Sequence, residues 1–314
     1  MLSPCCIALI IVLIIVIGAL TAGWVYIKDW IYRLENQEGD LPGAKVVEDI
    51  GYSGYLPTGL PTPDFDVKLA ALTIRACESA ANRRLGGDPR LPKGLVEVGW
   101  VGGHALILKV VPAKPVSGKD LFIVAIAGTL SYKDVRADFN DQLVDFYGAH
   151  AHAGFVGTWQ TMYPAIQKMA GANPNAQFIV AGHSLGAAVA TLVATGLGAD
   201  FPGIEVALYA SATPRTGSRD FVELLNRVAP NHWHITNRAD IVPTLPLAVS
   251  PITSGPMKGK SALYANFDRV VLFEAQSGTL GNNHFSGSYL CALVGGKTCS
   301  LDLWVTPPKA VSFI

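Results

Sequence analysis

Residues 178–190 read FIVAGHSLGAAVA, and this stretch decides the fold expected for the chain. Its first four residues are apolar and predict a short buried strand, while the Ala-rich run at its end predicts a helix. Between them lies GHSLG, residues 182–186, a pattern typical of a sharp strand-to-helix turn with a strained serine, Ser184, at its apex. Bulky side chains two positions away would obstruct such a turn, and Gly182 and Gly186 stand there. The alternative is an ordinary Gly-rich turn with an exposed serine.

Strand and helix patterns alternate on both sides of this turn. Strands are expected at residues 95–101, 104–111, 121–127, 178–181, 204–210 and 233–236, and helices at residues 65–84, 156–169, 185–197 and 219–228. Such alternation favours a mostly parallel central sheet with helices on both faces, the arrangement of α/β hydrolases. We expect one catalytic domain over residues 64–314.

An apolar segment precedes this domain. Residues 7–27 carry no charged side chain and are long enough to cross a bilayer as a helix, so residues 1–33 are expected to form an N-terminal transmembrane anchor. Residues 34–63, rich in Gly and Pro, are expected to be a linker. The alternative is a secretory signal that is cleaved, although no basic residue precedes the apolar run.

The sequence gives only weak indications of the compartment in which the catalytic domain lies. Lys28 and Arg33 follow the span, and no Asn lies two residues before a Ser or Thr, so the chain has no N-glycosylation acceptor. Both features favour a cytoplasmic position of the catalytic domain. Cys291 and Cys299 could form a disulfide in an oxidising compartment. The oligomeric state is not indicated.

The charge distribution excludes one class of partner. The chain has 24 basic and 24 acidic side chains and no basic stripe, whereas nucleic-acid binding needs clustered positive charge. Nucleic acid is therefore not an expected partner.

A nucleophilic serine needs a base and an acid. In α/β hydrolases these follow the serine in the order acid, then histidine. His284, in a polar stretch, is the predicted base, and Asp240, just after the strand expected at residues 233–236, is the predicted acid. Asp268 and Glu274 are weaker alternatives for the acid.

The oxyanion formed during ester cleavage also needs hydrogen-bond donors. One is expected from the backbone N–H of Leu185, the residue after the nucleophile. The other is expected from Thr129, which follows a predicted strand and Gly128. The alternative for Thr129 is a simple polar cap at a strand end.

Several ordered motifs resemble the class 3 lipase family, which is related to the fungal triacylglycerol lipases. The motifs are IAGTLS at 126–131, DVRAD at 134–138, HAGF at 152–155, GHSLG at 182–186, TPRTG at 213–217 and DIVP at 240–243. This resemblance implies the same triad, with His284 at the place of the family base. The chain departs from the family pattern at Ala127, Val135 and Ala212, where the family usually has Arg, Trp and Gly, and these differences concern the oxyanion loop and its neighbours.

The resemblance also implies a cover over the site. Family members often carry a short lid after the oxyanion residue, and residues 130–149 contain several apolar side chains at that place. We consider both a mobile lid and an ordinary surface helix for this stretch.

These features together predict a membrane-anchored lipase that cleaves acylglycerol-type esters through an acyl-enzyme on Ser184. No cofactor or metal is required; His150 with His152, and His232 with His234, lack a third ligand nearby. Alternatives that share the residues are an esterase acting on other acyl esters and a membrane-bound acyltransferase. A non-catalytic membrane scaffold is more distant.

Overall fold

The structure is a computed structural model that describes residues 55–60, 64–111, 118–128, 142–252, 258–276, 280–294 and 304–312. The expected transmembrane segment at residues 7–27 lies outside this part of the chain. Within the described ranges, no helix has both the length and the apolar character needed to cross a bilayer.

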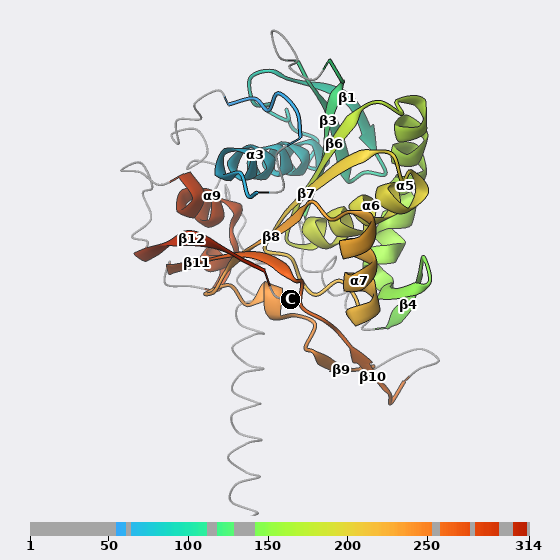
Figure 1. Cartoon of the computed structure of the whole chain (residues 1–314). Helices are drawn as coiled ribbons and strands as arrows, with labels where there is room; N and C mark the ends of the chain where they lie inside the picture. The colour runs from blue at the N-terminus through green and yellow to red at the C-terminus, as the bar shows by residue number, and fades with distance from the viewer. Residues whose placement is uncertain are drawn as a thin grey trace, which may run out of the picture. The chain divides into compact units, whose positions relative to one another are not determined.

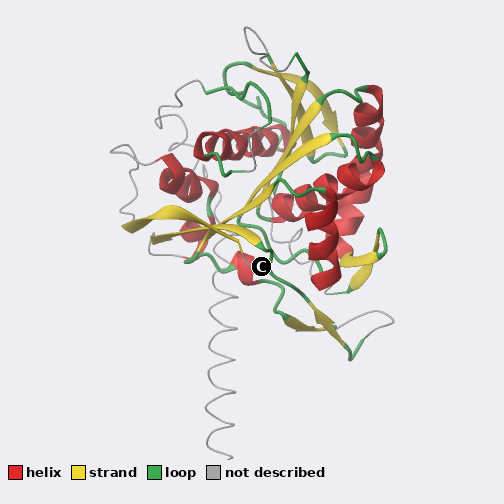
Figure 2. Cartoon of the chain, viewed as in Figure 1, coloured by secondary structure: helices red, strands yellow, loops and turns green. Residues whose placement is uncertain are grey.

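The centre of the fold is an eight-stranded sheet (Figures 1 and 2). In spatial order its strands are β1 (Leu95–Val101), β2 (Ala105–Val110), β3 (Leu121–Ile126), β6 (Gln177–His183), β7 (Glu205–Ser211), β8 (His232–Asn237), β11 (Arg269–Gln276) and β12 (Trp304–Ser312). The five strands from β3 to β11 run parallel, while β1, β2 and β12 pair antiparallel at the two sides. The prediction of a mostly parallel sheet is confirmed. Within β1, the pairing register shifts between Glu97 and Gly99, which marks a bulge in this edge strand.

Helices cover both faces of the sheet (Figure 1). One face packs against α5 (Ala153–Ala172), α6 (Leu185–Asp200) and α7 (Arg219–Val228). The other packs against α3 (Val67–Arg84) and α9 (Ser286–Val294). This burial explains the sequence patterns, since every residue of β3 is buried and a doubly covered strand reads as one continuous apolar run.

The helix that follows the GHSLG turn is unusually deep in the core. In α6, every residue from Leu185 to Gly198 is buried. Small side chains allow close approach, and a Cβ on Gly198 would stand 2.1 Å from the carbonyl oxygen of Val228 in α7. The Ala-rich composition of α6 therefore reflects packing on all sides.

Two short hairpins lie outside the main sheet: β4 (Leu143–Phe146) pairs with β5 (Ala149–His152), and β9 (Val249–Pro251) pairs with β10 (Ser261–Leu263). Where the sequence favoured a surface helix or a lid over residues 130–149, residues 143–149 form the first of these hairpins and not a helix. Tyr147 and Gly148 both have positive φ, as a tight hairpin turn requires, and Phe146 is buried against Trp159. Residues 143–149 therefore belong to a packed hairpin, while 130–141 lie outside the described residues.

Candidate active site

Ser184 stands at the junction of β6 and α6 with φ 59° and ψ −131°, a backbone conformation that side chains strongly disfavour. The glycines around it allow this geometry. A Cβ on Gly182 would lie 2.1 Å from the Gly186 carbonyl oxygen, and one on Gly186 would lie 2.5 Å from that of Ile126. Because both obstacles are backbone atoms, the turn forms only when both positions lack a side chain.

The start of α6 supplies a donor beside the serine. Leu185 is the first residue of the helix, so its N–H has no intrahelical acceptor. The end of β3 lies against the same turn, because a Cβ on Gly128 would stand 2.9 Å from the His183 carbonyl oxygen and 3.8 Å from Ser184 Cβ. Arg84 holds this strand end from α3, with Nη1 donating to the Gly128 carbonyl at 2.9 Å. Thr129, the next residue, lies outside the described residues.

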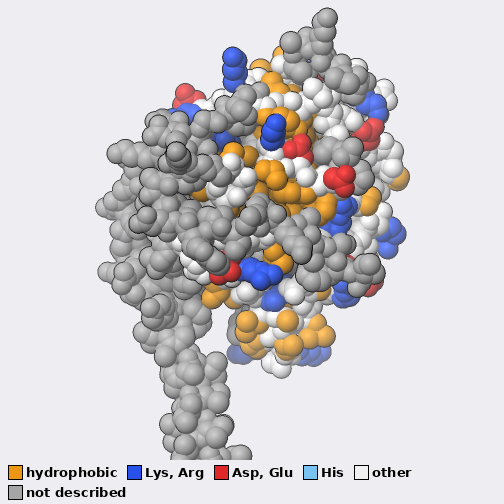
Figure 3. All heavy atoms as spheres, turned by 60° about the vertical axis from the view of Figure 1, so that its left-hand side comes forward, with side chains coloured by type: hydrophobic (Ala, Val, Ile, Leu, Met, Phe, Trp, Pro, Cys, Tyr) orange, Lys and Arg blue, Asp and Glu red, His pale blue; other side chains and the backbone are white. Residues whose placement is uncertain are grey.

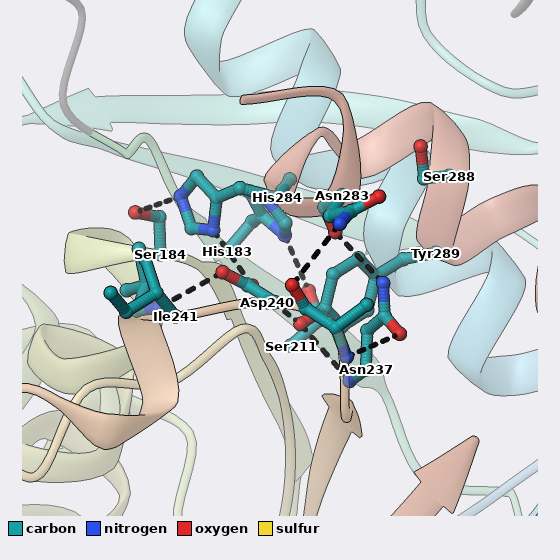
Figure 4. A network of polar contacts seen from close by, with 12 residues as sticks. His183, Ser184, Ser211, Asn237, Asp240, Ile241, Asn283, His284, Ser288 and Tyr289 are labelled. Atoms are coloured by element: carbon teal, nitrogen blue, oxygen red, sulfur yellow. Dashed lines mark hydrogen bonds and ion pairs between the residues drawn. The ribbon is translucent and has the colours of Figure 1, made fainter. Parts of the chain in front are cut away.

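His284 is the last residue of the short helix α8 (Leu280–His284) and contacts both other predicted triad members (Figure 4). Its Nε2 lies 2.8 Å from Ser184 Oγ, and its Nδ1 lies 2.8 Å from Asp240 Oδ2. Since an ionised carboxylate only accepts, Nδ1 carries the proton and Nε2 is left with a lone pair facing the serine hydroxyl. The structure thus brings these three side chains into one hydrogen-bonded chain, although they are separated by up to 100 positions in the sequence.

The side chain of Asp240 is fully buried and held by three donors. Besides His284, the backbone N–H of Val242 donates to Oδ1 at 2.9 Å, and the hydroxyl of Tyr289 donates to Oδ2 at 2.7 Å. These hydrogen bonds fix the carboxylate in a position closed to water. The alternative acid Asp268 is engaged elsewhere, accepting from Arg219 at 2.7 Å.

His183, inside the elbow, supports the site from behind. Its Nε2 lies 2.9 Å from the backbone carbonyl oxygen of His284, and its Nδ1 lies 2.9 Å from Ser211 Oγ. Because a carbonyl only accepts, the proton resides on Nε2, and Ser211 donates to Nδ1. Burial lowers the pKa of His183 to about 3, so this neutral tautomer persists.

Sequence reasoning missed a second group of residues that fixes the loops of the site. The amide of Asn237, at the end of β8, donates to the carbonyls of Ala275 and Asn283, at 2.9 and 3.0 Å. Its backbone N–H donates to the Tyr289 hydroxyl at 3.2 Å. One buried side chain therefore links β8 and β11 to the segment that carries His284. The available signal was a polar residue at the carboxyl end of a parallel strand.

Three other histidines make structural contacts. His152 is the N-cap of α5, where Nδ1 accepts from the N–H of Gly154 at 3.1 Å, and His150 contacts Asp220 at 2.6 Å. His234 stacks on Phe267 in the core. Among the described residues, no group of three or more His, Cys, Asp or Glu side chains could hold a metal ion.

One of the departures from the family pattern has a backbone consequence. Ala212, where the family usually has Gly, is buried and has φ 53°, in the region that favours glycine. Its N–H donates to the Ile235 carbonyl at 2.9 Å, which holds the loop after β7 close to β8. Ala212 therefore has a backbone conformation that residues with a side chain disfavour.

Sequence comparison relates this architecture to known proteins. Residues 123–250 match the family Lipase (class 3). A secreted mono- and diacylglycerol lipase A of Penicillium cyclopium is 37% identical over 135 residues, which cover 40% of this chain and 43% of the relative. A secreted mono- and diacylglycerol lipase 1 of Fusarium solani is 31% identical over 131 residues, covering 40% of this chain and 39% of the relative. The chain thus spans less than half the length of these two relatives.

Solved structures share the fold at low identity. A fungal lipase–inhibitor complex, described as a model for interfacial activation in lipases, aligns with a TM-score of 0.50 and 18% identity over 71% of this chain and 94% of that chain. A propeptide complex of the Rhizomucor miehei lipase aligns with a TM-score of 0.50 and 17% identity over 76% of this chain and 82% of that chain. The resemblance to the class 3 lipase family predicted from the motifs is therefore confirmed over residues 123–250, in a chain that has the fold of fungal lipases.

Proposed function

We propose that this protein hydrolyses carboxylic esters of lipids, of the acylglycerol type, through an acyl-enzyme on Ser184. The observation that carries the proposal is the chain of two 2.8 Å contacts from Ser184 through His284 to the buried carboxylate of Asp240. The relatives named mono- and diacylglycerol lipases support the choice of substrate class.

The first half of the reaction forms the acyl-enzyme. Ser184 Oγ attacks the carbonyl carbon while His284 Nε2 takes its proton, and Asp240 stabilises the imidazolium that results. The oxyanion accepts from the N–H of Leu185 and, in this proposal, from Thr129. When the intermediate collapses, the ester C–O bond breaks, and the alcohol leaves with the proton from His284.

The second half releases the fatty acid. Water attacks the acyl carbon while His284 Nε2 takes one of its protons, and a second oxyanion forms at the same donors. Collapse of this intermediate breaks the bond to Ser184 Oγ, which recovers its proton from His284. These steps need only groups of the chain, substrate and water.

The decisive experiment compares wild type with Ser184→Ala, using acylglycerol and short-chain esters. Loss of the nucleophile should lower kcat by at least about 10⁴-fold and abolish labelling by a fluorophosphonate. Thr161→Ala is the matched control because it removes an exposed hydroxyl from α5, where Thr161 Oγ1 donates only to the Thr158 carbonyl. Hydrolysis that survives in Ser184→Ala would contradict the proposal.

For localisation, we propose that the catalytic domain works in an oxidising compartment, with residues 1–33 as a membrane anchor or, alternatively, as a cleaved signal. Cys291 is disulfide-bonded, and disulfides persist in oxidising compartments. The two relatives are named as secreted proteins, which supports the same side of the membrane. The mass of the mature protein would distinguish anchor from signal.

A further inference from the structure

We propose that the β9–β10 hairpin docks this protein on an anionic lipid surface, an inference that rests on the proposed function for its substrate. The docking face consists of Leu247, Val249 and Leu263, whose exposed fractions are 58%, 59% and 62%. Val249 and Leu263 are direct cross-strand partners and so lie side by side on one face. Exposed apolar side chains that gather in this way mark a surface for interaction.

The face of the hairpin opposite the docking face is buried against the rest of the protein. This burial, together with the alternation of side chains along a strand, leaves the docking face exposed. Ser250 and Ala262, the intervening residues, are both buried. Ala262 belongs to a small core with Ile252 and Tyr264, and Leu143 from the β4–β5 hairpin packs against it. Because alternate residues of a strand point to opposite faces, anchoring the inner face presents Val249 and Leu263 outwards.

Arg215 fixes the base of the hairpin to the main sheet. Its Nη1 donates to the carbonyls of Pro246, at 2.7 Å, and Thr244, while its Nε donates to Asn266 Oδ1 at 2.8 Å. These acceptors lie on both legs of the hairpin, before β9 and after β10. A single side chain from the loop after β7 therefore holds the two legs together, and the docking face is presented by a fixed element.

The charge of the hairpin favours an anionic surface. Residues 241–267 contain no Asp or Glu, and Lys258 and Lys260 are exposed. Neither lysine has a carboxylate partner among the residues described by the structure. In Figure 3, the lowest coloured part of the surface, at the height where Figure 1 shows β9 and β10, combines hydrophobic side chains with Lys or Arg at its margin. Apolar side chains with cationic neighbours complement an interface of anionic headgroups and acyl chains.

The hairpin is also tied to the catalytic acid. The 3₁₀ turn Val242–Thr244 begins two residues after Asp240, and the Val242 N–H donates to its carboxylate. Val249 stands nine positions after Asp240, a length of chain that reaches at most about 30 Å. Docking through this hairpin would therefore hold the triad close to the lipid surface.

Hydrogen exchange of the full chain, measured by mass spectrometry with and without vesicles, tests this docking. The Ser184→Ala variant avoids lipid turnover, and the vesicles are phosphatidylcholine alone or mixed with phosphatidylserine. We expect amides of residues 247–252 and 258–264 to exchange at least about threefold more slowly with the anionic vesicles, whereas those of β1 should not change. Because exchange is read segment by segment, the result is independent of any membrane binding by residues 1–33.

Three sets of substitutions sharpen the test. Leu247→Thr/Val249→Thr/Leu263→Thr should abolish the protection, and Lys258→Gln/Lys260→Gln should weaken anionic binding by about fivefold per lysine. The matched control is Val96→Thr/Val98→Thr, which removes two half-exposed apolar side chains from β1 and should retain the protection. In otherwise wild-type protein, the docking-face variant should lose about tenfold in activity on anionic vesicles containing diacylglycerol, with short-chain soluble esters unaffected.

The outcomes separate this inference from the proposed function. Exchange that is unchanged by anionic vesicles, or equally slowed in the triple variant, overturns docking even if the enzyme is active. Protection that grows with protein concentration in the absence of vesicles would assign the face to a second copy and also overturns it. Absence of ester hydrolysis in wild type would instead contradict the proposed function and leave the exchange result standing.

Discussion

The carboxylate of Asp240 receives donors from three elements, and each fixes a different aspect of the triad. The Val242 N–H comes from the turn after β8, His284 from α8 and Tyr289 from α9. Since Tyr289 and His284 share Oδ2, the position of the phenol affects the acceptor that orients the imidazole. We therefore propose that Tyr289 is a positioning residue of the proposed triad, acting through Asp240.

Tyr289→Phe tests this role while retaining the ring that packs against Phe273. The variant loses the donor to Asp240 and leaves the Asn237 N–H without its acceptor in the core. We expect kcat to fall by about tenfold with KM nearly unchanged, and the free energy of unfolding to fall by about 1–3 kcal/mol. Steady-state kinetics and urea denaturation measure the two effects. A stability loss without any change in kcat or its pH profile would assign Tyr289 a merely structural role.

At the residue scale, the sequence was most informative where chemistry demands a local pattern. The GHSLG turn pointed to Ser184 because strained backbone geometry restricts the neighbouring residues. Asn237 carried only the weak signal of a polar residue at a strand end and Tyr289 carried none, because the roles of both depend on partners brought together from distant segments. A lone Tyr in an apolar run such as residues 288–294 is interpreted as ordinary core until those partners are known.

At the scale of elements, contact between β6, α6 and β3 depends on two positions without side chains. Gly186→Ala would place Cβ 2.5 Å from a carbonyl of β3, and neither backbone can yield cheaply. We expect the free energy of unfolding to fall by at least about 2 kcal/mol, together with loss of activity, because the turn carrying Ser184 must shift.

Gly157→Ala provides the control for this substitution. Gly157 lies in α5, and a Cβ there would meet nothing within 4 Å. The added methyl should therefore raise helix stability by about 0.5–1 kcal/mol. Chemical denaturation of both variants distinguishes a steric effect at the GHSLG turn from a general response to alanine. Equal changes in the free energy of unfolding of Gly186→Ala and Gly157→Ala would contradict this account.

The four long helices were predicted from the sequence, whereas the two longest strands, β11 and β12, and the short strands of the two hairpins were not. The helix expected at residues 219–228 is α7, because a strong 3.6-residue apolar period lets it bury one face. By contrast, β9 and β10 have three residues each and β4 has four, too few to establish a period. The apolar run Val270–Phe273 is the signal by which β11 could have been found.

For the whole molecule, buried histidines should set the response to acid. Burial lowers the pKa of His152 and His232 to about 4 and that of His183 to about 3, and it depresses the pKa of His234 as well. All four titrate near 6.5 when unfolded, so between pH 6.5 and about 4 the unfolded state binds more protons. The free energy of unfolding should therefore fall as pH falls through this window.

One buried carboxyl opposes this trend. Burial raises the pKa of Glu78 to about 7, so between pH 4.5 and 7 the folded state holds this proton more tightly, and the contribution of Glu78 to stability grows as pH falls. Ser286 donates to Glu78 Oε1 at 2.8 Å, two residues after His284. Because four histidines lower the stability in acid and one carboxyl raises it, we expect the free energy of unfolding to fall overall as pH falls.

His152→Asn tests the histidine contribution, because asparagine retains an acceptor for the start of α5 and cannot be protonated. In urea denaturation at pH values from 4.5 to 7, the variant should lose less stability on acidification, by up to about 1.4 kcal/mol per pH unit. Thr161→Ala is the control, because it removes an exposed hydroxyl of α5 that does not titrate and should leave the slope unchanged. Parallel pH profiles for wild type and His152→Asn would contradict the assignment.

The backbone angles of Ser184 lower the stability of the folded protein at the position that holds the proposed nucleophile. Glycine has no side chain and adopts these angles without strain. Glycine at position 184 would therefore raise the free energy of unfolding by about 1–3 kcal/mol. The protein instead retains the hydroxymethyl group whose oxygen faces the imidazole. The protein therefore tolerates fewer further destabilising substitutions than one with glycine at this position would.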